Sequence, residues 1–187
     1  METTLLLETE RLRLRLPVMT DAETIQALVS VPRIAETTLN IPHPYPVDGA
    51  IQWVNAVHGS LATGYGRSFV IVRQADNTVM GAISVREKRA TLHAEIGYWI
   101  GLPYWGQGYM TEAVRRVIAY CFDELGLNRV YATHFATNPA SGRVMQKAGM
   151  QYEGTLRGHV IKWGEPLDLC CYSILRSDYA AGQETTA

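Results

Sequence analysis

The chain has 187 residues, of which 17 are basic and 18 acidic, so its formal net charge is -1. This length predicts one globular domain, and a hydrophobic content of 47% argues against intrinsic disorder. Near-neutral charge excludes a general attraction to nucleic acid or anionic lipid, and three cysteines without metal-ligand spacing predict neither a disulfide framework nor a metal site. Without a signal-peptide pattern or an apolar run of ~18 residues, we expect a cytoplasmic protein with no membrane or nucleic-acid partner.

The first fifty residues carry strand and helix signals separated by prolines. Residues 11–16 alternate arginine and leucine, which predicts a strand with one buried leucine face. Thr20 and Glu23 have the spacing of a capping box, so we expect a helix with Thr20 as its N-cap. The proline-rich stretch 31–49 is expected to be irregular, and a second helix is expected over 49–62.

The middle of the chain predicts a strand–helix–strand unit. Apolar residues spaced three and four apart over 110–125 predict an amphipathic helix packed on a sheet, and Gly126 suits its end. A strand over 129–135 follows, so the strands on either side of this helix should be parallel. The strands expected before the helix have short connections that favour antiparallel pairing, and they cover residues 68–73, 78–86 and 91–100.

The last quarter of the chain predicts one helix and two strands. Asn138 and Pro139 begin a helix that ends near residue 149. Strand signals follow over 151–161 and 166–175, and residues 180–187 are expected to form a disordered tail. The chain is therefore of the α/β class, with a mixed, twisted sheet covered by helices on both faces.

A glycine-containing bend joins the strand over 91–100 to the strongest helix. Gly106 and Gly108 let the backbone turn tightly and let a ligand approach it. The first amides of a helix lack intrahelical partners and lie at the positive end of its dipole, which suits a pyrophosphate. The P-loop motif is absent, and Thr111 stands where a dinucleotide-binding motif has its third glycine, so a bare strand–helix connection is the alternative.

Several segments around this bend resemble the central motif of the GNAT superfamily of N-acetyltransferases, and more narrowly its ribosomal-protein N-terminal acetyltransferases of the RimJ/RimL type. The resemblance spans about residues 8–179 and implies one acetyltransferase domain there. It also implies the GNAT-like three-layer sandwich, in which two parallel strands splay apart. The segments that carry it are Glu95–Ile100, Tyr104–Ala113, Asn138–Ser141 and Lys147–Met150, together with 8–15 and 44–46.

The resemblance implies that acetyl-CoA binds in the gap between the splayed strands, as a cosubstrate and without a metal. Its pantetheine arm would pair with the strand edge like an added strand, and its pyrophosphate would lie on the amides of the bend. Asn138 and Ser141 would face the cofactor near its sulfur. The implied cofactor-binding residues are Tyr98, Trp99, Ile100, Gly106, Gln107, Gly108, Tyr109, Met110, Thr111, Asn138 and Ser141.

Two methionines depart from the superfamily pattern. Met110 stands where a small residue usually opens the helix, although main-chain amides can bind a phosphate whatever the side chain. Many members carry a tyrosine, at the position of Met145, that protonates the departing thiolate. Methionine cannot do this, and Ser141 is the nearest replacement, as in the RimJ/RimL subgroup.

The expected reaction is direct attack of an amine on the thioester in a ternary complex. A strand amide near Trp99 or Ile100 would stabilise the developing oxyanion. Glu95 is the candidate base, with a strand-face ion pair as the alternative interpretation. Ser141 is the candidate hydrogen-bond donor to sulfur, with helix capping as the alternative. Tyr45, in the proline loop, is expected to be a wall of the acceptor site.

The expected acceptor is a protein N-terminal amine, from the subgroup resemblance. Such an α-amine has a pKa near ~8, against ~10.4 for lysine, so it needs less help from a base. The alternatives are a small amine, such as an amino acid, a polyamine or an aminoglycoside, and a non-catalytic CoA-binding module. The shape of region 31–66 should separate a peptide groove from a closed pocket. A homodimer is plausible for the subgroup.

Overall fold

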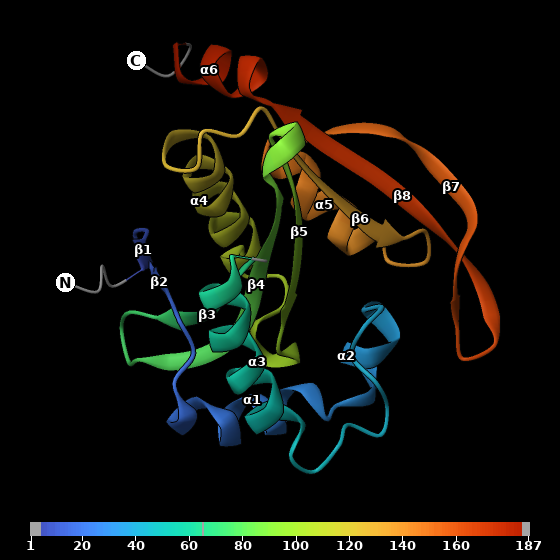
Figure 1. The fold of residues 1–187 in the computed structure, drawn as a ribbon. Helices are drawn as coiled ribbons and strands as arrows, with labels where there is room; N and C mark the ends of the chain where they lie inside the picture. The colour runs from blue at the N-terminus through green and yellow to red at the C-terminus, as the bar shows by residue number, and fades with distance from the viewer. Residues whose placement is uncertain (1–4, 65, 185–187) are drawn as a thin grey trace.

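The computed structural model describes residues 5–64 and 66–184, and its strands form one mixed sheet (Figure 1). The strand order in the described chain is β1-β2-β3-β4-β5-β6-β8-β7. The strands are β1 (Leu6–Glu8), β2 (Leu12–Arg15), β3 (Arg67–Arg73), β4 (Thr78–Lys88), β5 (His93–Ile100), β6 (Arg129–Phe135), β7 (Gln151–Lys162) and β8 (Glu165–Leu175). The α-helices are α1 (Ala22–Val29), α2 (Pro32–Thr37), α3 (Gly49–Thr63), α4 (Tyr109–Asp123), α5 (Pro139–Lys147) and α6 (Arg176–Glu184). None of the described helices is long and apolar enough to cross a membrane.

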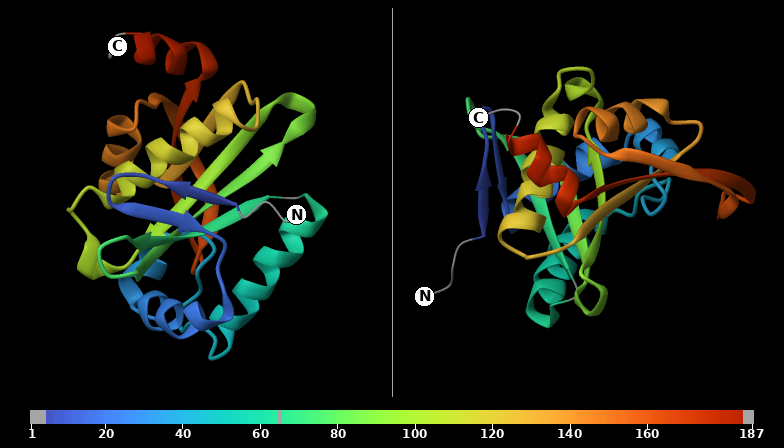
Figure 2. Two further views of the ribbon diagram at one scale, coloured as in Figure 1. Left: turned by 90° about the vertical axis from the view of Figure 1, so that its left-hand side faces the viewer. Right: turned by 90° about the horizontal axis from the view of Figure 1, so that it is seen from above.

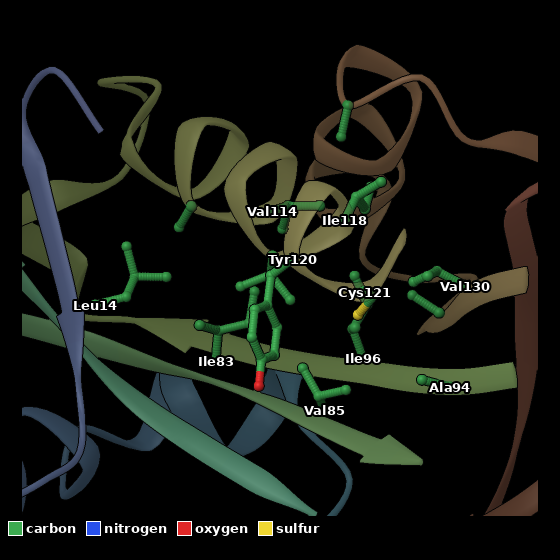
Figure 3. Packing of buried hydrophobic residues seen from close by; sticks show 14 of the residues in the cluster. Leu14, Ile83, Val85, Ala94, Ile96, Val114, Ile118, Tyr120, Cys121 and Val130 are labelled. Atoms are coloured by element: carbon green, nitrogen blue, oxygen red, sulfur yellow. The ribbon is translucent and has the colours of Figure 1, made fainter. Parts of the chain in front are cut away.

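Helices cover both faces of the sheet, which confirms the expected three-layer architecture (Figure 2). On one face the apolar stripe of α4 packs on the central strands, where Val114 and Ile118 belong to the same buried cluster as Ile83 and Ile96 (Figure 3). On the other face α1 and α3 form a smaller cluster with β3 and β4. The strict helical spacing of the α4 stripe is what places that helix across the sheet.

The sheet has one parallel pair in the described chain, between β5 and β6, as the strand–helix–strand pattern predicted. Their pairing begins at His93 with Arg129 and ends at Glu95 with Tyr131. β5 then continues to Ile100 without pairing to β6 in the described chain. The two strands therefore splay apart, as expected, and each leaves a free edge.

Several other expectations from the sequence are confirmed. The alternating segment forms β2, whose Leu12 and Leu14 are fully buried. The second helix appears as α3, and α5 begins after its N-cap Asn138. The two last strands form a long antiparallel hairpin, β7–β8, that reaches away from the body of the molecule (Figures 1 and 2).

The expected N-cap of the first helix is wrong. Thr20 lies inside a 3-10 turn, and α1 begins after Asp21. The Asp21 carboxylate accepts the Val18 amide at 2.8 Å and both terminal nitrogens of Arg15 at 2.7 and 2.8 Å. These hydrogen bonds hold residues 18–21 in the 3-10 turn, so α1 begins one residue beyond the expected position, and the Asp21 side chain makes no cap hydrogen bond to α1.

Three further expectations need correction. Residues 31–49 are not wholly irregular, because Pro32 occupies the first turn of α2, where a missing N–H costs nothing. β1 was not expected, since it has no alternation and becomes a strand by pairing with β2. The expected tail over 180–187 is helical through Glu184, because α6 continues there, and residues 185–187 lie outside the described chain.

Candidate active site

Two hollows meet at the gap between β5 and β6. The first, of about 380 Å³, lies between the end of β5 and the starts of α4 and α5; we call it the α4–α5 hollow. The second, of about 650 Å³, lies on the opposite face beneath α1 and α3, and we call it the α1–α3 hollow. Residues that line both hollows mark the passage between them, and they are Thr37, Thr38, Tyr98, Trp99 and Ser141.

The glycine bend forms one end of the α4–α5 hollow. Gly106 and Gly108 have φ of +74° and +82°, a region that favours glycine, and Gly108 is the N-cap of α4. The first amides of α4 therefore have no intrahelical partner and open on the hollow. Gln107 is the one predicted residue of the bend that does not line the hollow; its side chain donates to the Pro103 carbonyl at 2.7 Å.

The free edge of β5 supplies amides to the gap. The amide of Gly101 donates to the carbonyl of Met80 on β4 at 2.8 Å. Because amide directions alternate along an antiparallel strand, the Trp99 amide also faces β4, whereas those of Tyr98 and Ile100 face away from it. The carbonyl of Ile100 accepts the indole N–H of Trp105 at 2.7 Å, on this same free side. The amides of Trp99 and Ile100 were the two candidates for stabilising the oxyanion. Only the Ile100 amide points away from β4 and into the gap, so it is the one that could do so.

The start of α5 brings a serine to the same gap. The Asn138 side chain accepts the Ser141 amide at 3.4 Å, as an N-cap does, and donates to the Thr37 carbonyl at 3.5 Å. The Tyr98 hydroxyl lies 3.0 Å from Ser141 Oγ and 3.2 Å from the Ser141 carbonyl oxygen. Burial raises the pKa of Tyr98, and the hydrogen bond to Ser141 lowers it less. The phenol is therefore a permanent hydrogen-bond donor at ordinary pH.

Glu95 faces the α1–α3 hollow, at the last rung of the parallel pair. Its carboxylate lies 3.4 Å from the guanidinium of Arg86, its direct neighbour across β4, so the strand-face ion pair is present. Both side chains are substantially exposed, at 33% for Glu95 and 56% for Arg86, which makes this a weak pair. Because the pair is weak and exposed, Glu95 can form it and still act as a base.

The α1–α3 hollow has aromatic walls and few negative charges. Tyr45 lines it and packs on the cluster of α1 and α3, and burial raises the pKa of its hydroxyl. Trp53 and Trp99 also line it. Among its described lining residues Glu95 is the one carboxylate, whereas Arg67 and Arg86 are both cationic.

The methionines that depart from the superfamily pattern both lie in the core. Met145 is 1% exposed and lines neither hollow. Met110 is 6% exposed and packs within the large cluster, and it also lines the α4–α5 hollow.

Sequence reasoning missed two groups of lining residues. Arg143 and Lys147, one turn apart on α5, bring positive charge to the α4–α5 hollow. Their spacing after Asn138 was a usable signal, because cations beside a predicted pyrophosphate site suit its charge. The other group is Ile34 and Thr37 of α2 with its C-cap Thr38, which had no local signal.

The groups that line the α4–α5 hollow are suited to binding the phosphates of coenzyme A. Left-handed glycines, the free amides of α4 and two cations converge there. The passage beyond it has a free strand edge suited to an extended amide-bearing chain.

Comparisons with known proteins agree with this geometry. Residues 11–151 match the family model "Acetyltransferase (GNAT) domain". The uncharacterized N-acetyltransferase YoaA of Bacillus subtilis is 32% identical over 172 residues, covering 91% of this chain and 97% of YoaA. 

Two solved structures share the fold at lower identity. The ribosomal L7/L12 α-N-protein acetyltransferase RimL superposes with a TM-score of 0.82 at 20% identity, covering 91% of this chain and 97% of RimL. The spermidine N-acetyltransferase of Vibrio cholerae superposes at 0.79 and 21%, covering 92% and 99%. The fold alone thus does not choose the acceptor, but with the family match and the relative it leads to one conclusion: this chain belongs to the GNAT family, and it is an acetyl-CoA-dependent N-acetyltransferase.

Proposed function

We propose that this enzyme transfers the acetyl group to the N-terminal amine of a protein. The observation that carries the proposal is the composition of the α1–α3 hollow, whose described lining has aromatic walls and one carboxylate, Glu95, already paired with Arg86. A polyamine would bring several positive charges to this surface, and most of them would find no acidic partner there. A peptide with one N-terminal amine and an otherwise uncharged chain suits the α1–α3 hollow better. The resemblance to the RimJ/RimL subgroup supports the same acceptor.

In the proposed mechanism the cosubstrate supplies the activated acetyl group, and the chain positions it and handles the charges. Amides of the bend, with Arg143 and Lys147, hold the phosphates in the α4–α5 hollow. The Ile100 amide donates to the carbonyl oxygen, where negative charge develops. Glu95 accepts a proton from the attacking amine, directly or through a water. Ser141 donates a hydrogen bond to the departing sulfur.

The experiment combines binding with an acceptor panel. Calorimetry should give saturable binding of coenzyme A, and mass spectrometry should detect acetylation of peptides that begin with Ser, Ala or Met. The matched control is the same peptide with a formylated N-terminus and an internal lysine, which should stay unmodified. An enzyme that acetylates spermidine, free amino acids or an aminoglycoside faster than every peptide would refute the proposed acceptor. Absence of binding at millimolar coenzyme A would refute the cofactor site.

A small-molecule amine is the second candidate, and one observation favours it. The Lys162 side chain, from β7, donates to the carbonyls of Thr38 and Leu39 at 2.5 and 3.5 Å. Both of those residues line the α1–α3 hollow, so the contact holds the hairpin beside its rim. A compact amine needs such an enclosed site more than a peptide does. The acceptor panel separates the two candidates.

A further inference from the structure

A tyrosine from β5 contacts the serine that faces the sulfur. The position where many GNAT enzymes carry a thiolate-protonating tyrosine is here Met145, which is buried in the core. The phenol of Tyr98 approaches Ser141 from the opposite wall of the gap, on a different element of the fold. Both residues line the passage between the two hollows. A tyrosine hydroxyl is therefore present in the passage between the two hollows, where it contacts Ser141.

The proton of the Tyr98 hydroxyl has two acceptors within reach. It can be donated to the Ser141 carbonyl oxygen, at 3.2 Å, or to Ser141 Oγ, at 3.0 Å. When it goes to the carbonyl, the serine hydroxyl can donate its own proton to the phenol oxygen. When it goes to Oγ, the serine proton is free to point elsewhere. The choice between the two arrangements requires only hydroxyl rotation.

A negatively charged sulfur in the gap would select the second arrangement. Hydrogen bonds to an ionised acceptor are roughly twice as strong as neutral ones, and hydroxyls in a chain strengthen one another. Ser141 then donates to sulfur while Tyr98 donates to Ser141. We propose that Tyr98 is the positioning residue that orients the Ser141 hydroxyl toward the departing thiolate. This inference rests on the proposed function, because it assumes that Ser141 faces the sulfur.

The step balances without a proton leaving Tyr98 or Ser141. The amine nitrogen forms a bond to the carbonyl carbon and loses its proton to Glu95 or water. The carbon–sulfur bond breaks, and its electron pair leaves with the sulfur as a thiolate. The two hydroxyls donate hydrogen bonds to that charge, and the thiolate takes its proton from solvent on release. The raised pKa of Tyr98 suits this role, since the phenol keeps its proton throughout.

The first test is Tyr98→Phe, which removes one oxygen and keeps the ring packed on the core. We expect kcat to fall about tenfold, the loss that corresponds to one hydrogen bond of about 1.4 kcal/mol, while KM for acetyl-CoA changes by less than about twofold. Tyr172→Phe is the matched control. It removes another phenol that contacts α5, through Gln146 at 3.3 Å, outside both hollows, and should leave kcat unchanged.

The double variant separates positioning from an independent role. Because Tyr98 acts through Ser141, Tyr98→Phe combined with Ser141→Ala should be no slower than Ser141→Ala alone. Losses that multiply would overturn the proposal, and so would a kcat for Tyr98→Phe equal to that of the wild type.

A titration of bound coenzyme A needs no acceptor, so it distinguishes this inference from the proposed acceptor. Hydrogen bonds to a thiolate favour the charged form, so they lower the pKa of the thiol relative to free coenzyme A. We expect the ultraviolet absorbance of the thiolate to appear at lower pH for coenzyme A bound to wild-type enzyme, and to return toward the free value in Tyr98→Phe. Equal thiol pKa values in the two proteins would overturn the inference, even for an enzyme that acetylates peptides. An enzyme inactive on every peptide but with the expected shift would overturn the acceptor alone.

Discussion

At the scale of single residues, the functional groups of this enzyme depend on their neighbours across the gap. Asn138 caps α5 and at the same time holds α2 through the Thr37 carbonyl. The Trp105 indole donates a hydrogen bond to the Ile100 carbonyl. The amide of Ile100, on the same side of the strand, is left for a ligand. Each of these side chains therefore has a structural partner and a place at the site.

Glu95→Gln tests the proposed base. The α-amine of an acceptor is mostly protonated below its pKa of ~8, and proton removal by a positioned carboxylate is worth about a hundredfold or more. We expect kcat/KM to fall by that order at pH 6.5 and the deficit to shrink above pH ~8, where the amine is already neutral. A pH–rate profile measures this. Glu165→Gln, at the exposed first residue of β8, is the control. A loss of kcat/KM that is equal at every pH would show that Glu95 is not the base.

Asp21→Asn tests the carboxylate that anchors the turn before α1. Burial alone would raise the pKa of Asp21, but hydrogen bonds from Arg15 and from the Val18 amide outweigh it and hold the pKa below its ordinary value of 3.8. The carboxylate therefore stabilises the fold at pH values above 3.8, and this stability is lost as pH falls below that value. We expect Asp21→Asn to lower the free energy of unfolding by about 2 kcal/mol at pH 7.

Urea unfolding at pH 7 and at pH 3 measures this difference, which should shrink at the lower pH. Asp76→Asn is the matched control, because Asp76 forms the same kind of pair with Arg73 on the surface. An exposed pair contributes far less to stability. Equal losses for the two variants would contradict the anchor's role.

At the scale of elements, the glycine bend can be tested against a glycine at the other end of the same helix. Gly106 and Gly126 have φ of +74° and +69°, and at neither would a Cβ meet a described heavy atom within 4 Å. Alanine should cost each position about 1 kcal/mol of backbone strain. Gly106 lines the α4–α5 hollow, so Gly106→Ala should also weaken coenzyme A binding about tenfold, whereas Gly126→Ala should not.

Calorimetry and thermal melts measure the two effects separately. Equal affinities in the two variants would mean that the bend does not contact the phosphates.

The elements with strong local patterns were predictable, and those made by tertiary contact were not. The stripe of α4, the alternation of β2 and the Asn-Pro start of α5 each carry their own periodicity or cap. β1 has three residues and no alternation, so only its pairing with β2 defines it. The start of α2 had a signal, proline at the first helical turn, which the surrounding prolines obscured.

In the candidate site, too, features set by local sequence were predictable and those made by tertiary contact were not. The tight turn at Gly106 and Gly108 and the N-cap at Asn138 were predictable because they depend on local conformation. The approach of Tyr98 to Ser141 spans 43 residues of sequence and depends on how far β5 diverges from β6, which no local pattern encodes.

At the scale of the whole molecule, the C-terminal hairpin is tied to the N-terminal half through Lys162. This side chain is 8% exposed, and burial lowers the pKa of its amine. It donates to the Thr38 and Leu39 carbonyls and lies 4.6 Å from the centre of the Trp163 ring. The contact joins the two sides of the opening over the α1–α3 hollow.

Lys162→Met should remove the hydrogen bonds to the Thr38 and Leu39 carbonyls while keeping most of the side-chain packing. We expect the amides of residues 38–41 to exchange with deuterium at least about tenfold faster, because local opening no longer breaks these hydrogen bonds. Hydrogen exchange read by mass spectrometry measures this. Lys88→Met, on an exposed lysine of β4, is the control. Unchanged exchange would mean that the hairpin is held by other contacts.

The short pairing of β5 with β6 has a mechanical consequence. Five strands on one side and three on the other are joined, within the described chain, by rungs that end at Glu95 and Tyr131. We expect relative twisting of the two halves to concentrate where β5 and β6 part, since the strands within each half are paired with their neighbours apart from local bulges in β3–β4 and β7–β8. A cosubstrate bound along the open part of this gap, as proposed, would bridge the two halves. We expect its binding to reduce their relative twisting, an effect that reaches beyond the loop proposed to hold its phosphates.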